Sequence, residues 1–203
     1  MTGLEYSDLT SDQILQCYRQ GIFPMAENRD SADIFLVDPK IRGIIPLDGL
    51  HISRSLKKTL KQNLFAVTFD TCFKQVMIEC AKMTSDRSET WINEPILSLY
   101  CELHERGFGH SVEVWFEDKL VGGLYGLSIG AAFFGESMFS RRANASKVAL
   151  VKLVEHLNDQ NYQLLDTQFL TDHLARMGGI EISREDYHIL LSRALDGKAV
   201  FTG

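Results

Sequence analysis

Two short motifs place polar side chains in apolar surroundings, where they could do chemistry. In GESMFSRR, at 135–142, Glu136 follows an apolar run, and in LLDTQF, at 164–169, Asp166 and Gln168 lie two residues apart. Residues two apart in a strand project from the same face, so Asp166 and Gln168 are expected to line one cleft. Burying an unpaired carboxylate is costly, so Glu136 needs either solvent or a partner. Solvent exposure and hydrogen bonds at a sheet edge are the non-catalytic alternatives for these residues.

A third candidate site is the basic helix expected within HISRSLKKTLKQN, at 51–63. It contains Arg54, Lys57, Lys58 and Lys61 but no acidic residue, although the whole chain has a net charge of −6. An acidic chain is not expected to bind nucleic acids indiscriminately, but a local basic stripe can bind phosphates. The pattern therefore predicts either a phosphate-binding surface or a solvated helix face.

The histidines and cysteines do not occur at metal-ligand spacing, so no metal site is expected. The four cysteines include no C-x-x-C pair and lie in apolar surroundings, which is typical of free thiols in a core. Catalysis is therefore expected to use other side chains.

The composition is that of a packed globular chain, with 45% apolar and 24% charged residues. A length of 203 residues suits one domain with a small addition. No apolar run approaches the roughly 20 residues that a membrane-spanning helix needs. The first residues, MTGLEYSDLT, lack the basic start and apolar stretch of a secretory signal. We therefore expect a soluble, cytoplasmic protein without a membrane segment.

The first 50 residues are predicted to form a small N-terminal unit. Thr10 and Gln13 have capping-box spacing ahead of a short helix that ends at Gly21. Residues 21–33 have a loop-like composition, and proline and glycine interrupt residues 41–50. We expect a domain boundary there, which divides the chain into a small N-terminal α/β domain at 1–50 and a main domain at 51–203.

The main domain is predicted to have an α+β fold. Its expected elements are a helix at 51–63, a strand at 65–69, a helix capped by Asp70, a helix at 96–106, an antiparallel meander at 110–136, a helix capped by Asn144 and a strand at 162–169. A meander followed by a helix and a strand is the order found in GNAT-like acetyltransferases. Acetyltransferases, however, hold the pyrophosphate of coenzyme A on a glycine-bearing loop before that helix. The corresponding segment, SMFSRRANASK at 137–147, has no glycine, so no cofactor is expected.

Motifs along nearly the whole chain resemble one enzyme family. They are YRQGIFPM at 18–25, LHISRSL at 50–56, TWI at 90–92, HSVEVW at 110–115, VGGLYG at 121–126, FGESMFSRRANASK at 134–147, and LLDTQF with the nearby TDH at 164–173. In this order they resemble bacterial leucyl/phenylalanyl-tRNA-protein transferases. FGESMFS with NASK eight positions after the glutamate is a specific pattern.

The resemblance implies transfer of Leu or Phe from aminoacyl-tRNA to proteins that begin with Arg or Lys, which marks them for degradation. Since one methylene in an apolar pocket is worth only about 1 to 3 kcal/mol, some transfer of Met is also expected. The resemblance also implies an acetyltransferase-like domain that uses no coenzyme A, and we expect a monomer. By motif, the active-site polar residues are Glu136, Asp166 and Gln168, and Trp91 lies near the terminal adenosine. The residues that match the apolar pocket for the amino acid are Leu124, Phe133, Met138, Leu150 and Leu165.

The chain departs from the family pattern at two places. Met25 follows Phe-Pro where many relatives have tryptophan, and Leu36-Val37 stands where two tryptophans are common. Stacking of a base on an aromatic ring contributes roughly 1 to 3 kcal/mol, so adenosine binding is expected to be weaker here. Two rival functions remain at this point: a coenzyme A-dependent N-acyltransferase and a non-catalytic tRNA-binding module.

Overall fold

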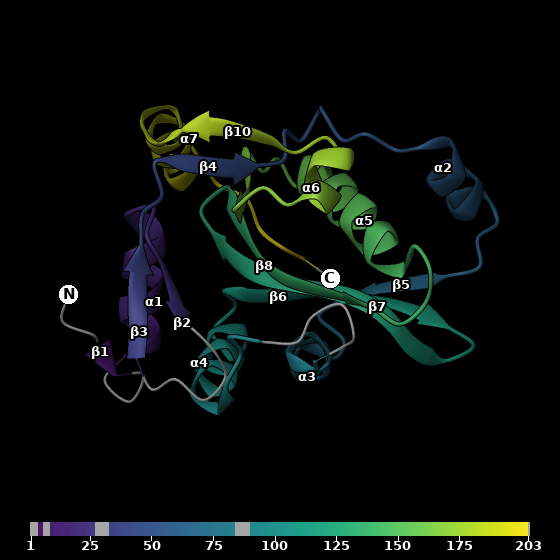
Figure 1. The fold of residues 1–203 in the computed structure, drawn as a ribbon, viewed down its shortest axis with the longest axis horizontal. Coiled ribbons are helices and arrows are strands. Elements are labelled where there is room, and N and C mark those ends of the chain that lie inside the picture. The colour runs from purple at the N-terminus through teal and green to yellow at the C-terminus, as the bar shows by residue number, and fades with distance from the viewer. Residues whose placement is uncertain (1–3, 6–8, 27–32, 84–89, 203) are drawn as a thin grey trace.

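The computed structural model describes residues 4–5, 9–26, 33–83 and 90–202. Two sheets and seven helices make up this part of the chain (Figure 1). The small sheet has the order β1-β3-β2, with strands Leu4–Glu5, Asp33–Val37 and Phe23–Ala26. The large sheet has seven strands in the order β10 (Ile180–Ser183), β4 (Ile41–Ile44), β9 (Leu164–Gln168), β8 (Ala132–Ser140), β7 (Lys119–Ile129), β6 (Gly109–Phe116) and β5 (Ala66–Phe69).

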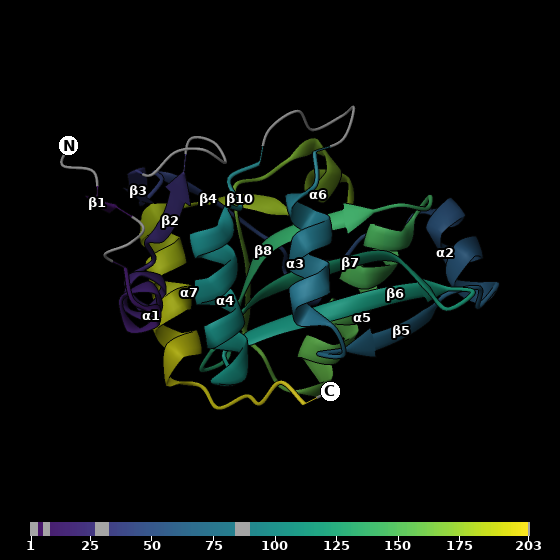
Figure 2. The same ribbon diagram turned by 90° about the horizontal axis from the view of Figure 1, so that it is seen from below.

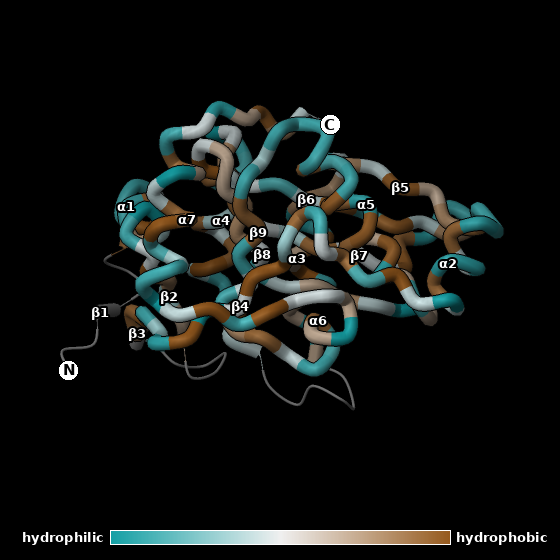
Figure 3. The backbone as a smooth tube through the Cα atoms, turned by 90° about the horizontal axis from the view of Figure 1, so that it is seen from above, coloured by the Kyte–Doolittle hydropathy of each residue, from teal (hydrophilic) through white to brown (hydrophobic). Residues whose placement is uncertain are grey.

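Helices cover both faces of the large sheet. One face packs against α1 (Ser11–Arg19), α3 (Phe73–Ala81), α4 (Glu94–Glu105) and α7 (Arg184–Asp196), and the other packs against α2 (Arg54–Lys61), α5 (Ala145–Asp159) and α6 (Asp172–Arg176). Figure 2 shows α3 and α4 in front of the sheet and α5 behind it. Alternate strand residues enter the two resulting cores: Tyr125 lies in one and its neighbour Leu124 in the other. Figure 3 shows hydrophobic segments through the middle of the molecule.

The antiparallel meander of β6, β7 and β8 confirms the prediction for residues 110–136. Only β8 and β9 pair in parallel, among the strand pairs of the described residues, and α5 makes the crossover that a parallel pair requires. This pairing covers three residues and ends at Phe134 opposite Asp166. Beyond that pair the two strands diverge, although β8 continues to Ser140. The divergence opens the sheet at the motifs that contain the candidate polar residues.

The structure confirms one prediction near the N-terminus and corrects two others. The capping box of Thr10 and Gln13 is present, and the helix ends just before Gly21, where φ is +75°. The segment expected to be a loop at 21–33 instead contains β2 and the start of β3, and residues 27–32 lie outside the described part of the chain. Pro24 is compatible with a strand because β2 is at the edge of its sheet. Residues 41–44 form β4, a strand within the large sheet.

Two predicted helix caps are also wrong in detail. Asp70 does not cap α3, which begins after Cys72; its carboxylate instead binds the backbone N–H of Ser111 and the ring of His110. Asn144 occupies the N-cap position of α5 with φ +70°, and its side chain caps no backbone N–H. The Asn144 amide donates instead to the hydroxyl of Thr59 at 3.0 Å. That contact joins the start of α5 to α2.

Candidate functional site

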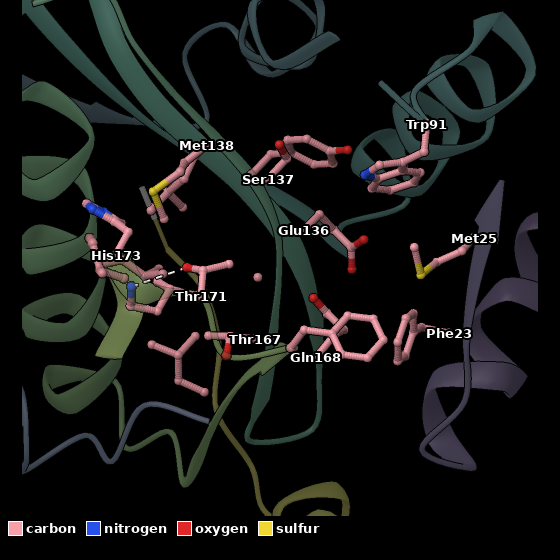
Figure 4. A pocket seen from close by; sticks show the side chains of 18 of the residues that line it. Phe23, Met25, Trp91, Glu136, Ser137, Met138, Thr167, Gln168, Thr171 and His173 are labelled. Carbon is pink, nitrogen blue, oxygen red and sulfur yellow. Dashed lines mark hydrogen bonds between the residues drawn. The ribbon is translucent and has the colours of Figure 1, made fainter. Parts of the chain in front are cut away.

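The opening between β8 and β9 is the mouth of a cavity of about 640 Å³ (Figure 4). Strand residues from Gly135 to Met138 form one wall, and residues from Thr167 to Phe169 form another. Leu150 and Leu153 of α5 and His173 of α6 line it from the far side of the sheet. Most of the lining side chains are apolar, so the cavity suits a ligand with a large apolar group.

Most of the residues predicted from the sequence line this cavity. The structure brings together Trp91, Leu124, Glu136, Met138, Leu150, Leu165 and Gln168. Phe133 lies outside the cavity wall, where it is fully buried against Tyr162 and Phe201. Asp166 is also outside the wall and has no exposed surface. The basic helix α2 lines a separate hollow.

Glu136 owes its orientation to a β-bulge. Tyr125 of β7 pairs with Ser137 and Gly126 pairs with Gly135, so Glu136 is the extra residue on β8. Bulges interrupt the ladder and turn a side chain, and they are common beside active sites. Figure 4 shows Glu136 pointing toward Gln168 across the cavity.

Two buried tyrosines hold the carboxyl group of Glu136. Tyr18 of α1 donates to Oε1 at 2.6 Å, and Tyr100 of α4 donates to Oε2 at 3.3 Å. The two hydroxyl groups also lie 2.8 Å apart. Burial raises the pKa of Glu136 to about 8, although both tyrosine hydrogen bonds act to lower it. The negative charge of Asp166 raises the pKa further. The site therefore holds a carboxyl group that gains or loses a proton near neutral pH.

Asp166 forms a buried ion pair behind the cavity. Arg42 of β4 donates two hydrogen bonds to it, at 2.9 Å from Nε and 2.6 Å from Nη2, and Tyr187 of α7 donates a third at 2.8 Å. The guanidinium lies between the rings of Phe23 and Tyr187, 4.5 and 4.4 Å from their centroids. Arg42 and Asp166 are 1% and 0% exposed, so this charge pair is a rigid support.

Gln168 depends on Asp166 through its backbone. Its N–H donates to Asp166 Oδ1 at 2.8 Å, and its φ of +57° is rare for a residue with a side chain. Thr167 is an extra residue on β9 opposite β4, since Gly43 pairs with Gln168 and Ile44 with Asp166. The bulge interrupts strand alternation, so the expectation that Asp166 and Gln168 line one cleft together is corrected. Gln168 faces the cavity, and Asp166 holds its backbone from behind.

The side-chain amide of Gln168 is available to a ligand. Its Nε2 atom is buried and makes no hydrogen bond within the described part of the chain. The same holds for the Thr167 hydroxyl, another group of the cavity wall. A buried polar group without a partner is costly, and such groups in a cavity wall are satisfied when a polar ligand binds.

A second set of residues around the site was not predicted from the sequence. Arg42, Tyr18, Tyr100 and Tyr187 hold the polar residues, and Phe23 lines the cavity together with Met25 and Trp91. An arginine in an otherwise apolar stretch, at IRGII, was the available signal for Arg42, because such a charge needs a partner. Nothing comparable in the sequence distinguishes the tyrosines from ordinary core residues.

The diverging strands and the cavity define a class of protein: an α/β protein whose cavity suits a ligand with a large apolar group and has a weakly acidic carboxyl group in its wall. Comparison of the sequence with known families identifies the particular family. Residues 44–192 match the family described as leucyl/phenylalanyl-tRNA protein transferase, and residues 7–40 match the N-terminal domain of that family. The chain belongs to the leucyl/phenylalanyl-tRNA protein transferase family.

Curated relatives agree with this assignment. Proteins named leucyl/phenylalanyl-tRNA--protein transferase from Paramagnetospirillum magneticum and Maricaulis maris are each 54% identical to this chain. The alignments cover 95% of this chain in both cases, and 92% and 89% of the two relatives. Among solved structures, L-PGS from Bacillus licheniformis matches 78% of this chain and 65% of its own, at 12% identity and a TM-score of 0.47. A similarity this low does not establish a common fold.

Within the described residues, no helix combines the length and the apolar character that crossing a membrane requires.

Proposed function

We propose that this protein transfers Leu, Phe or Met from aminoacyl-tRNA to the N-terminal amino group of proteins that begin with Arg or Lys. The observation that carries the proposal is the apolar cavity with Glu136 and Gln168 facing each other in its wall. Family membership supports the reaction type. The transferred tag directs the acceptor to degradation in the cytoplasm, and the enzyme acts as a monomer.

The reaction is aminolysis of an ester. The acceptor nitrogen, as a neutral amine, forms a bond to the carbonyl carbon, and the bond from that carbon to the ribose oxygen breaks. The attacking nitrogen loses one proton as it becomes an amide, and the ribose oxygen receives that proton. An α-amino group has a pKa of about 8, and burial gives Glu136 a similar pKa. Because the two pKa values are matched, the ionised form of Glu136 can accept the proton of the incoming ammonium and so supply a neutral amine. No covalent intermediate is needed.

Gln168 is proposed to position the reacting groups. An amide is a poor base, but its unpartnered Nε2 can donate to the carbonyl oxygen as negative charge develops there. Asp166 is a positioning residue, because it binds the backbone N–H of Gln168. In this arrangement Leu124, Met138, Leu150 and Leu165 contact the amino-acid side chain, and Trp91 contacts the terminal adenosine.

We further propose an acetyltransferase-like fold for the main domain, supported by the diverging parallel strands β8 and β9. The small N-terminal domain, expected from the sequence at 1–50, is proposed to end near residue 40 instead. Two observations support that boundary: β4 pairs within the large sheet, and the two family matches change between residues 40 and 44.

Single-turnover transfer tests the proposal. Radiolabelled Leu-tRNA is mixed with a peptide that begins with Arg, and the labelled peptide is separated. We expect transfer to this peptide, none to the same peptide acetylated at its N-terminus, and less to one that begins with Glu. Failure to label the Arg peptide, together with micromolar binding of acetyl-coenzyme A, would favour the N-acyltransferase alternative.

A further inference from the structure

Two cations stand beside the cavity on different helices. Lys147 lies three residues before Leu150 on α5, and Arg176 lies three residues after His173 on α6. Residues three apart are neighbours on a helix face. Because Leu150 and His173 line the cavity, each cation is about one helical turn, roughly 5 Å along the helix axis, from its wall.

The positive charges of Lys147 and Arg176 are not neutralised within the described part of the chain, where neither forms an ion pair. Both act on the same group: burial is the largest cause that lowers the pKa of His173, and Lys147 and Arg176 lower it further. Lys147 and Arg176 are therefore both close to His173, on one side of the cavity.

Neighbouring cations are already engaged. Arg141 donates to Glu79 with two nitrogens, at 2.9 and 2.6 Å, and Arg142 lies over the ring of Phe116 at 3.5 Å. Arg176 is exposed and Lys147 is half-buried, so both are within reach of a ligand. Two unpaired charges next to a cavity favour an anionic ligand.

The cations also continue from the basic helix. Asn144, three residues before Lys147, is hydrogen-bonded to Thr59 of α2, whose basic residues line their own hollow. Figure 1 shows α2, α5 and α6 on one side of the large sheet. The basic helix α2 is therefore joined through Asn144 to the first turn of α5, which carries Lys147.

A donor tRNA whose ester carbon lies in the cavity must present its last phosphates at the cavity edge. Phosphates near α2 must belong to nucleotides farther from the ester. We propose that Lys147 and Arg176 bind the phosphates of the 3′-terminal nucleotides of the donor, and thereby position the ester. This inference rests on the proposed function. It adds Lys147 and Arg176 to the tRNA-binding residues and assigns the terminal phosphates to them and the more distant phosphates to α2.

Three donors of increasing size test the inference: leucyl-adenosine without phosphates, a leucylated CCA trinucleotide, and Leu-tRNA. The double variant Lys147→Met/Arg176→Gln is compared with Lys152→Met/Arg193→Gln, which loses the same charge elsewhere on α5 and α7. KM and turnover are measured for each donor over a range of salt concentrations, with a thermal melt of every variant.

We expect the double variant to raise KM for the trinucleotide and the tRNA but not for leucyl-adenosine. Two lost contacts to a single strand should reduce the log–log dependence of KM on salt by about 1.4. The single variant Lys147→Arg, which keeps the positive charge, should leave KM close to that of the unaltered protein. Equal KM values for the trinucleotide in the double variant and the control would overturn the inference. A raised KM for leucyl-adenosine would also overturn it, because the residues would then shape the cavity. Absence of transfer by the unaltered protein would instead refute the proposed function.

Discussion

At the scale of single residues, the polar groups that line the cavity are distinct from the groups that hold them in place. Glu136 and Gln168 line the cavity, whereas Arg42, Asp166 and the tyrosines lie behind it. The sequence predicted Glu136, Gln168 and also Asp166, because all three belong to conspicuous motifs. It could not predict the contacts that hold them, since Arg42 and Asp166 are 124 residues apart and Tyr18 and Glu136 are 118 apart. Such contacts follow from the fold rather than from local spacing.

Replacing Gln168 by Ala should reduce single-turnover transfer by on the order of 10², which is typical of a positioned catalytic group. Stability should change little, because the amide Nε2 has no partner to lose. Asp166→Asn should also reduce transfer, and the double variant should be little worse than the singles if both act on one backbone position. Strictly additive losses would show that the two residues have separate roles.

The raised pKa of Glu136 predicts a pH dependence of stability. In the folded protein this group keeps its proton up to about pH 8, whereas in the unfolded chain it loses the proton near pH 4.5. Its stabilising contribution is therefore fully present below pH 4.5 and is lost as the pH rises through 8. Glu136→Gln should flatten the decline of the free energy of unfolding between pH 5 and pH 8.

Urea denaturation at several pH values measures that decline. Glu155→Gln, the same change at an exposed position of α5, is the control for the loss of one carboxyl group. A Glu136→Gln curve parallel to that of the unaltered protein would contradict the assignment of a raised pKa.

At the scale of elements, α5 has two roles. It completes the crossover between β8 and β9, and it contributes Leu150 and Leu153 to the cavity. The helix and the meander were predictable, because their periodicities of 3.6 and 2 residues are distinct in the sequence. The strands β2 and β4 were not, because Pro24 and Gly43 in them are typical of loops. The bulges at Glu136 and Thr167 have no signal in the apolar pattern either.

Leu150→Ala should change the ratio of Leu to Phe transfer by enlarging the cavity, since one methylene in an apolar pocket is worth about 1 to 3 kcal/mol. Leu157→Ala is a matched control: Leu157 is a buried leucine of the same helix that does not line the cavity. Both variants should be destabilised by about 2 to 5 kcal/mol. The ratio is measured with mixed Leu-tRNA and Phe-tRNA, and an unchanged ratio in folded Leu150→Ala would remove this residue from the pocket.

At the scale of the whole molecule, charge is distributed unevenly. The net charge is −6, yet α2 presents Arg54, Lys57, Lys58 and Lys61 around one hollow. If these side chains bind tRNA phosphates, replacing all four by Ala should reduce the log–log salt dependence of tRNA affinity by up to about 0.9 for each lost contact. Filter binding over a range of salt concentrations measures this slope. An unchanged slope would mean that α2 is a solvated surface.

The contact of Tyr18 with Glu136 links the N-terminal helix α1 to the large sheet through a group that changes charge. A ligand that alters the protonation of Glu136 must therefore alter how firmly α1 is held, and a change that loosens α1 must alter ligand affinity by the same factor. Binding of substrate at Glu136 and the stability of α1 are therefore thermodynamically coupled. Amide hydrogen exchange in α1 can thus report the chemical state of a carboxyl group 118 residues away in the chain.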